Sequence, residues 1–428
     1  MSGDTAIGIF AERPSPHHAA LRRRPVLRQT VQTPLPLLLL LSLNVLPTAP
    51  PATQETQDRI AGELRATLPL VLQTFVDARV ISGGVVAVTD AENTLFETAT
   101  GFTSLRPQQA MPAGTSFYLA SITKPMTATA FMRLVEAGEV SLDAPVSDYL
   151  PEFKDLKGPD GGSVVVTVRH CLTHTSGLND DRESAAGTLA EFVREMASRP
   201  VHFAPGSRWQ YSRGLDVIGR IAEVTTGLSY EDFMRKQLFE PLGMDHTDFG
   251  PPPDGQVAMP YRLVPGTGGL EPTPMDDLRL GSFTPFRPRW AVPSAGSFST
   301  AADLAKFARF LLNRGRANDR QLLSEESVAE LTRLQTGDLT TGFTPGNGWA
   351  LGFCVVRSPQ HVTRDVSPGT FGHGGVYGPQ FWVDPEAGLA QIILFERSDI
   401  GNADGSDVRE AVHAAARRAV RAAGSVGR

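Results

Sequence analysis

Apolar positions recur along the chain at two different spacings. A period of three to four residues, typical of an amphipathic helix, dominates the middle of the chain, whereas short apolar runs typical of strands occur near both ends. The predicted helices cover residues 57–79, 121–137, 189–196, 215–226, 229–240, 300–313 and 408–420. The predicted strands cover residues 83–88, 95–100, 349–356, 380–384 and 389–395. Strands at both ends with helices between them indicate that the two ends meet in one sheet.

The fold class predicted is α+β. The first hairpin joins the C-terminal strands in one antiparallel sheet flanked by helices, and the middle of the chain forms a mostly helical inserted lobe. We assign the sheet lobe to residues 56–118 and 290–424 and the helical lobe to residues 119–289. The stretch 250–296 is rich in Pro and Gly and is predicted to be a loop. The cleft between the lobes is the natural place for a functional site.

Residues 1–55 differ in composition from the rest of the chain. Arginines at 22–24 and 28 precede an apolar run at 37–43, an order typical of an export signal, and the basic part resembles a twin-arginine signal. The run is shorter than the about 20 residues that a bilayer requires, so we expect no stable membrane span. A disordered leader or a start codon placed too early explains the same composition. Localisation is therefore left open between a periplasmic or secreted protein and a cytoplasmic one.

Composition narrows the class of protein. The 428 residues are 41% hydrophobic and 20% charged with a net charge of −6, which is typical of a soluble globular protein and gives no reason to expect nucleic acid as a partner. Cys171 and Cys354 lie in apolar contexts and are expected to be small core residues rather than a disulfide. His170, Cys171 and His174 suggest zinc, but no further ligand follows at a suitable spacing, so no metal is expected. The number of subunits is not indicated.

Candidate chemistry centres on Ser121 and Lys124. If a helix begins at about Ser121, positions i and i+3 share one face, so the lysine ammonium group can reach the serine hydroxyl. A serine hydroxyl is a weak nucleophile until a neighbouring base takes its proton, and a lysine serves as that base when burial or nearby cations lower its pKa. A helix-capping serine followed by a solvated lysine has the same spacing. The pair alone therefore does not establish an enzyme.

Three stretches in order extend this pattern. They are Ser121-Ile122-Thr123-Lys124, Tyr211-Ser212-Arg213 and His373-Gly374-Gly375, with further likeness at 172–178, 205–212 and 299–303. Together they resemble the serine β-lactamase and penicillin-binding-protein superfamily, and within it the class C and family VIII carboxylesterase-like branch. The resemblance covers roughly residues 81–397.

The resemblance implies a mechanism. Ser121 would attack a carbonyl to form an acyl-enzyme, and Lys124 and Tyr211 would share the proton that Ser121 loses. A phenol near pKa 10 beside a cation can be held as phenolate and serve as a base. The oxyanion donors would be the backbone N–H groups of Ser121 and Val376. The substrate implied is a small-molecule ester or amide, with no cofactor.

Two of these motifs, Tyr211-Ser212-Arg213 and His373-Gly374-Gly375, affect which class of substrate is expected. Gly374 and Gly375 let a strand backbone pass close to the substrate, although a purely structural glycine bulge has the same composition. In the β-lactamases the tyrosine motif usually ends in asparagine and the last motif begins with lysine, whereas Arg213 and His373 stand here. A histidine side chain is mostly neutral at pH 7 unless its pKa is perturbed. His373 therefore does not supply the fixed positive charge that the lysine offers to a β-lactam carboxylate.

We therefore expect a carboxylesterase acting on small esters. A β-lactamase or a D-alanyl-D-alanine carboxypeptidase-type activity is the alternative within the same superfamily. A non-catalytic member that binds a cell-wall peptide through the same cleft is an alternative of another class. A Ser-His-Asp hydrolase of the α/β type is disfavoured, because no Gly-x-Ser-x-Gly elbow occurs in the chain.

Overall fold

The structure is a computed structural model of the chain, and it describes residues 53–178, 184, 186–253, 256–273, 290–400 and 405–424. Nearly all of the predicted leader lies outside these residues, as does part of the predicted loop at 250–296. In the described part of the chain, no helix has the length and apolar character needed to cross a bilayer.

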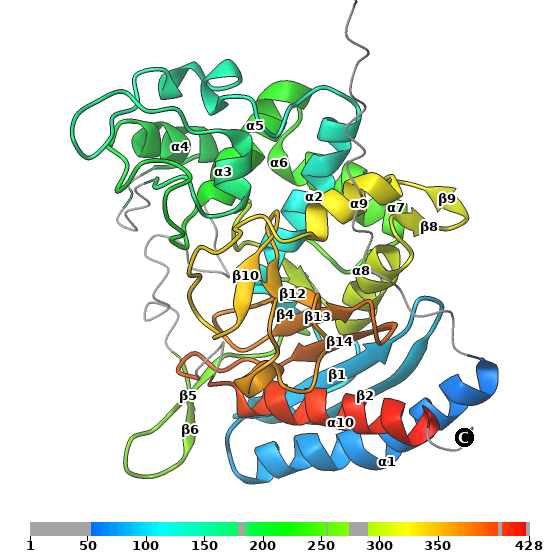
Figure 1. The fold of residues 1–428 in the computed structure, drawn as a ribbon. Coiled ribbons are helices and arrows are strands. Elements are labelled where there is room, and N and C mark those ends of the chain that lie inside the picture. The colour runs from blue at the N-terminus through cyan, green and yellow to red at the C-terminus, as the bar shows by residue number, and fades with distance from the viewer. Residues whose placement is uncertain are drawn as a thin grey trace, which may run out of the picture. The chain divides into compact units, whose positions relative to one another are not determined.

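One eight-stranded antiparallel sheet organises the fold (Figure 1). Its strands are ordered β10-β11-β12-β13-β14-β1-β2-β3. They are β1 Gly83–Thr89, β2 Thr94–Leu105, β3 Gln108–Ala110, β10 Asn347–Trp349, β11 Cys354–Val356, β12 Phe371–Gly374, β13 Gln380–Asp384 and β14 Leu389–Leu394. β1 pairs with β14, with Val86 opposite Ile393, so the first hairpin joins the C-terminal strands. The α+β class predicted from the sequence is confirmed.

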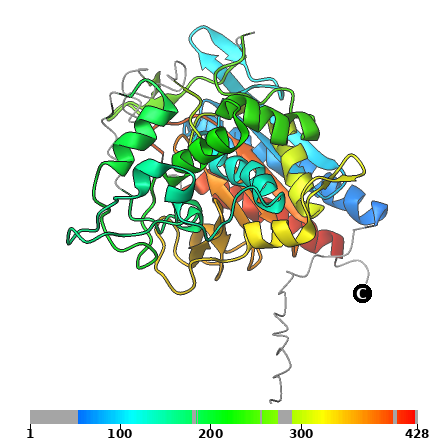
Figure 2. The ribbon, with the colours of Figure 1, turned by 90° about the horizontal axis from the view of Figure 1, so that it is seen from above.

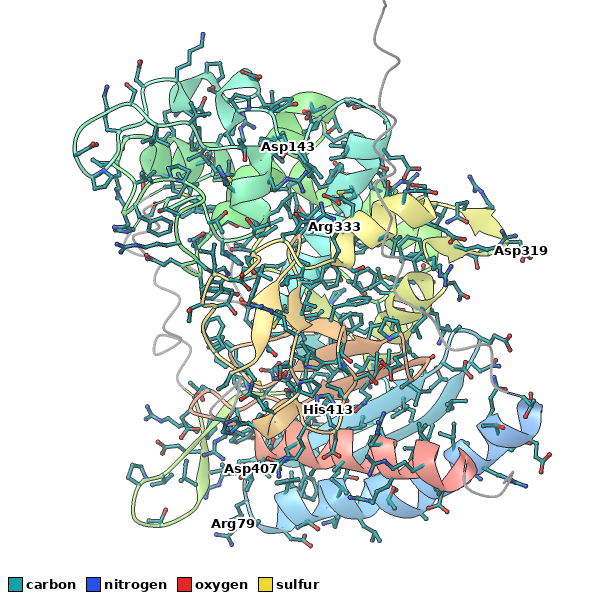
Figure 3. All side chains as sticks on the ribbon, viewed as in Figure 1. Arg79, Asp143, Asp319, Arg333, Asp407 and His413 are labelled. Atoms are coloured by element: carbon teal, nitrogen blue, oxygen red, sulfur yellow. The ribbon has the colours of Figure 1, made fainter. Side chains whose placement is uncertain are left out.

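Helices cover both faces of the sheet. α1 Gln54–Asp77 and α10 Asp407–Gly424 pack on one face and α8 Ala301–Leu312 on the other (Figure 1). All seven residues of β1 are buried, which explains why its sequence is a continuous apolar run rather than an alternation. Arg79, just after α1, and Asp407 lie at the same end of the helix pair (Figure 3). His413 of α10 hydrogen-bonds Gln391 of β14 at 2.8 Å and so fastens α10 to the sheet.

Most of the remaining α-helices in the described chain fall within residues 119–289, which were assigned to the helical lobe, whereas the helix at 325–332 lies in the part assigned to the sheet lobe. These helices are α2 Thr123–Glu136, α3 Val168–Leu172, α4 Leu189–Ala197, α5 Gly214–Thr226, α6 Tyr230–Met234, α7 Glu240–Leu242 and α9 Glu325–Thr332. α2 is buried almost all round, because it packs against α5, α6 and α9 on one side and approaches β12 on the other (Figure 1, Figure 2). The exact lobe boundaries stay a prediction.

Short strand pairs complete the described chain. They are β4 Phe117–Tyr118 with β7 Phe298–Ser299, β5 Tyr261–Leu263 with β6 Leu270–Pro272, and β8 Arg316–Ala317 with β9 Arg320–Gln321. The β5–β6 hairpin lies within 250–296, so the prediction of a loop throughout that stretch is wrong. The predicted helix ends at Thr300 and Asn313 are the caps of α8. The first helix begins at Gln54, earlier than predicted, because Thr53 caps it.

The predicted single strand at 349–356 is wrong. The chain reverses between β10 and β11, where the Ala350 N–H donates to Phe353 O at 2.8 Å and Gly352 adopts a φ of 75°. A Cβ at Gly352 would lie 2.7 Å from the Ala128 Cβ, so only glycine lets this turn press against α2. The residues on both sides of the turn are buried. The sequence pattern is therefore the same as that of one buried strand.

The predicted helix end before Pro241 is also wrong. A π-helical turn at Arg235–Phe239 leads directly into α7, which contains Pro241. Proline has no N–H, so it cannot donate to the carbonyl of Gln237. That carbonyl accepts instead from Arg133 Nη1 at 2.7 Å. A side chain from α2 thus compensates the proline and lets the helix continue.

Candidate active site

Ser121 lies in a short 3₁₀ turn at Ala120–Ile122, just before α2, and not at the start of an α-helix as predicted. Ala120 has a φ of 46°, a left-handed conformation that costs alanine on the order of 1 kcal/mol. Ser297 holds the turn from behind: its carbonyl accepts the Leu119 N–H at 2.9 Å, and its N–H donates to Thr123 Oγ1 at 3.1 Å. Ala120 and Ile122 are buried, whereas Ser121 lines the cleft.

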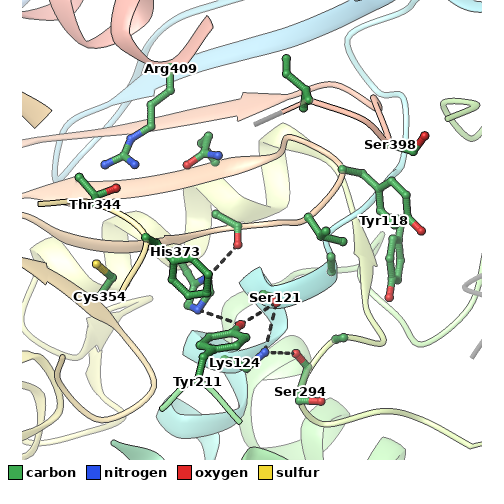
Figure 4. A pocket seen from close by; sticks show the side chains of 18 of the residues that line it. Tyr118, Ser121, Lys124, Tyr211, Ser294, Thr344, Cys354, His373, Ser398 and Arg409 are labelled. Carbon is green, nitrogen blue, oxygen red and sulfur yellow. Dashed lines mark hydrogen bonds between the residues drawn. The ribbon is translucent and has the colours of Figure 1, made fainter. Parts of the chain in front are cut away.

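Lys124 is buried in the first turn of α2 and points at Ser121. Its Nζ donates to Ser121 Oγ at 3.1 Å and to the backbone carbonyl of Ser294 at 2.8 Å (Figure 4). The ammonium group also lies 4.5 Å from the centre of the Tyr211 ring. The spacing of the serine and lysine therefore does bring the two groups into contact, although Ser121 lies in the 3₁₀ turn before the α-helix.

Tyr211 reaches the same serine from the loop before α5. Its hydroxyl donates to Ser121 Oγ at 2.8 Å and lies 3.4 Å from His373 Nε2 (Figure 4). The three residues expected to be catalytic thus meet at one oxygen atom, Ser121 Oγ. Ser121 and Tyr211 are 90 residues apart in the chain, so the fold, not local sequence, makes this contact.

His373 faces the Tyr211 hydroxyl from β12. Its Nδ1 lies 2.8 Å from Gly374 O, and because a carbonyl only accepts, Nδ1 carries the proton and Nε2 presents a lone pair to the phenol. Burial, together with the nearby Lys124 charge, lowers the pKa of His373 to about 3. The imidazole is therefore neutral at pH 7.

Arg213 forms an ion pair with Asp216, a residue that the sequence analysis did not identify as part of the site. Its Nε donates to Asp216 Oδ2 at 2.6 Å, and its guanidinium stacks 3.9 Å above the centre of the Phe192 ring. Asp216 is fully buried, and its Oδ1 accepts the Ser294 N–H at 2.9 Å. Because the Ser294 carbonyl holds Lys124, a continuous chain of contacts connects Arg213 to the lysine. The i, i+3 spacing of Arg213 and Asp216 was visible in the sequence, but nothing there indicated Ser294.

The turn after β12 approaches the serine turn closely. A Cβ at Gly375 would lie 2.6 Å from Leu119 O, so this position requires glycine. The Gly375 N–H donates to Pro379 O at 2.7 Å, and Val376 is exposed at the cleft. Within the described part of the chain, the backbone N–H groups of Ser121 and Val376 donate to no protein acceptor.

His174 is a second buried histidine at the site, and it was considered from the sequence only as a metal ligand. Its Nδ1 accepts the Ser212 N–H at 3.1 Å, and its ring lies 4.5 Å from the Tyr211 ring. Burial lowers its pKa well below the usual range, so the ring is neutral. His170 caps α3 by accepting the Thr167 N–H at 3.2 Å. Among the described residues, no group of three metal-ligating side chains is placed to hold an ion.

The site lies in a cleft of about 1090 Å³. Ser121, Lys124, Tyr211, Arg213, His373, Gly374 and Val376 all line it. Aromatic side chains form much of the rest of the wall, among them Tyr118, Phe343, Trp349, Tyr377 and Trp382. Both cysteines are free and buried, and burial raises the pKa of Cys354 to about 12.

Comparison with known proteins places these features in a wider group. The family model described as Beta-lactamase matches residues 70–416. Esterase EstB of Burkholderia gladioli is 33% identical over 368 residues, which is 78% of this chain and 91% of that protein. Penicillin-binding protein 4 of Amycolatopsis lactamdurans is 33% identical over 326 residues, covering 73% of this chain and 80% of that protein. The solved structure of EstCE1, described as a hydrolase with promiscuous acyltransferase activity, has a similar fold, with a TM-score of 0.71, 24% identity, and coverage of 83% of this chain and 99% of that chain.

Proposed function

The chain belongs to the beta-lactamase family and is a serine hydrolase, and we propose that it cleaves small carboxylic esters through an acyl-enzyme formed on Ser121. The observation that carries this proposal is the convergence of Lys124 Nζ and the Tyr211 hydroxyl on Ser121 Oγ, at 3.1 and 2.8 Å. A serine with two proton-exchanging groups in contact is an activated nucleophile.

The chemical steps follow from these contacts. Tyr211 enters this step as a phenolate beside the Lys124 ammonium group. Ser121 Oγ bonds to the ester carbonyl carbon while its proton passes to the Tyr211 phenolate, and the carbonyl oxygen becomes an oxyanion. The N–H groups of Ser121 and Val376 donate to no other protein group in the described chain, which suits them to bind that charge. The oxyanion then collapses, the C–O bond to the alcohol breaks, and Tyr211 returns the proton to the departing oxygen. Water attacks the acyl-enzyme in the same way and releases the acid.

Preference for esters over β-lactams rests on two side chains. His373 is neutral where the β-lactamases usually have lysine, and Arg213 is bonded to Asp216 where they usually have an asparagine amide. A simple ester needs only the nucleophile and the oxyanion donors. The similarity to Esterase EstB supports the same substrate class, while the similarity to Penicillin-binding protein 4 keeps a β-lactamase or D-alanyl-D-alanine carboxypeptidase-type activity as the second candidate.

Steady-state kinetics on matched chromogenic substrates tests the proposal. We expect kcat/KM for short-chain p-nitrophenyl esters to exceed that for nitrocefin at least about a hundredfold, which corresponds to roughly 2.7 kcal/mol of transition-state discrimination. D-alanyl-D-alanine peptides belong in the same panel. Equal turnover of nitrocefin and the esters would replace the esterase with a lactamase, and a folded protein that hydrolyses none of these substrates would favour the non-catalytic peptide-binding alternative.

A further inference from the structure

Phe343 is an apolar side chain in an unusual position. It lines the cleft with 55% of its surface exposed, and its φ is 76°, a left-handed conformation that a phenylalanine rarely adopts. Strained residues of this kind persist where the surrounding structure fixes them, and they concentrate at functional sites. The exposed part of the Phe343 ring faces the cleft and is available for contact with a bound molecule.

The loop that carries Phe343 is fixed against the site. A Cβ at Gly342 would lie 3.0 Å from the Trp209 ring, and Thr341 Oγ1 donates to Asn347 O at 2.9 Å. The Phe343 ring meets Trp209 and Tyr211 edge-on, with ring centres 6.0 and 5.0 Å apart. The Phe343 side chain is therefore held in place as part of the cleft wall, next to the Tyr211 side chain.

The position of this wall relative to the reaction follows from the proposed esterase mechanism, on which the inference rests. Tyr211 returns a proton to the departing alcohol, so the alcohol must lie within hydrogen-bond reach of the Tyr211 hydroxyl. Phe343 packs against the ring of that same tyrosine. The wall consequently borders the alcohol part of the ester rather than the oxyanion, which lies at Ser121 and Val376.

We propose that Phe343, held in place by its contact with Trp209, forms a subsite for the leaving alcohol that selects esters of uncharged aromatic alcohols. Aromatic rings prefer edge-on and offset contacts with one another, and the exposed face of Phe343 is available for such a contact. His373, which also faces Tyr211, is neutral, with its Nε2 3.4 Å from the Tyr211 hydroxyl oxygen (Figure 4). The Phe343 ring itself carries no charge, so it offers no ionic partner to an anionic alcohol group.

Acetate esters that differ only in the alcohol test the subsite. For the wild type we expect kcat/KM to fall in the order benzyl acetate, methyl acetate, 4-carboxybenzyl acetate. This constant includes the departure of the alcohol, so it reports on that group. Phe343→Ala should lower the value for benzyl acetate about tenfold and change that for methyl acetate less than twofold. Phe343→Leu, which keeps an apolar wall, should lie between, and Leu70→Ala, at an exposed apolar position on α1, should change neither.

The variant Phe343→Gly distinguishes the loss of the aromatic ring from a change in the conformation of the loop. Glycine adopts a φ of 76° without steric strain, so this variant can keep the loop conformation while removing the ring. It should show the same selective loss as Phe343→Ala. An equal loss on all three esters in both variants would mean that Phe343 only supports the fold, and unchanged selectivity would overturn the subsite while leaving the esterase intact. Failure of the folded wild type to hydrolyse any of the esters would overturn the proposed function itself, and the alcohol subsite with it.

Discussion

Asp216→Asn should weaken both folding and catalysis, because Asp216 connects Arg213 to the loop that holds Lys124. The carboxylate is fully buried and contacts Arg213 Nε at 2.6 Å and the Ser294 N–H at 2.9 Å. Asparagine keeps the shape and one acceptor but removes the charge. Breaking a buried ion pair by removing one partner costs about 3–5 kcal/mol. The Arg213 side chain is 14% exposed and stacks on Phe192, so we expect a loss at or below the lower end, about 2–3 kcal/mol.

The effect on turnover follows from the position of Lys124. The Ser294 carbonyl accepts from Lys124 Nζ at 2.8 Å, so a shift of this carbonyl moves the lysine away from Ser121. Misplacement of a catalytic group by about 1 Å can reduce the rate about a hundredfold. We expect kcat for a p-nitrophenyl ester to fall about 10- to 100-fold.

Asp232→Asn is the matched control. Asp232 pairs with Arg235 at the same sequence separation of three and at 2.8 Å, but its side chain is 48% exposed. Exposed pairs contribute about 0–1 kcal/mol, so this variant should keep its stability within that range and its full activity. Urea unfolding measures the first quantity and ester hydrolysis the second. Equal behaviour of the two variants in both assays would refute the positioning role of Asp216.

Three further outcomes are expected. Lys124→Ala and Tyr211→Phe should each lower kcat/KM about 10²–10⁴-fold, and the double variant should lose much less than the product, whereas multiplying losses would argue against a shared proton relay. The pKa of His373 is about 3 in the folded chain, so between about pH 6.5 and 3 the unfolded state binds the extra proton. Stability should therefore fall as pH decreases through this window, and less steeply in His373→Asn; identical urea midpoints against pH in the two proteins would contradict this. Burial raises the pKa of Cys354 to about 12 and that of Cys171 further, so neither thiol should react with a thiol reagent at pH 8 until urea unfolds the chain; rapid labelling of the native protein would show that the site opens.

Elements with a strong local pattern were predictable from the sequence. β1 is buried on both faces, so its apolar run is continuous, and the capping residue Thr300 marks the start of α8. That the first hairpin joins the C-terminal strands in one sheet followed from the placement of strands at both ends of the chain, whereas the pairing of β1 with β14 was not predicted. These features depend on residues that are near one another in sequence, or on the requirement that every strand finds a partner.

Features that depend on distant partners were not predictable. The turn at Gly352 exists because it fits against α2, and the helix continues through Pro241 because Arg133 compensates it. The link from Asp216 through Ser294 to Lys124 joins residues 78 and 170 positions apart, so no local pattern contains it. The roles expected of the site residues came from the order of three motifs and their resemblance to a family, and periodicity alone would have left Ser121 as a capping residue.

Covalent labelling of Ser121 tests the central claim most directly. Wild type and Ser121→Ala are each treated with a fluorophosphonate, and the intact mass and the peptide map are measured by mass spectrometry, with urea midpoints to confirm that both proteins are folded. We predict one adduct on the wild type, located to Ser121, that blocks ester hydrolysis in proportion to its occupancy, and no adduct on the folded Ser121→Ala. An adduct on another residue, labelling that persists in Ser121→Ala, or a folded wild type that takes up no label would contradict the assignment of Ser121 as the nucleophile.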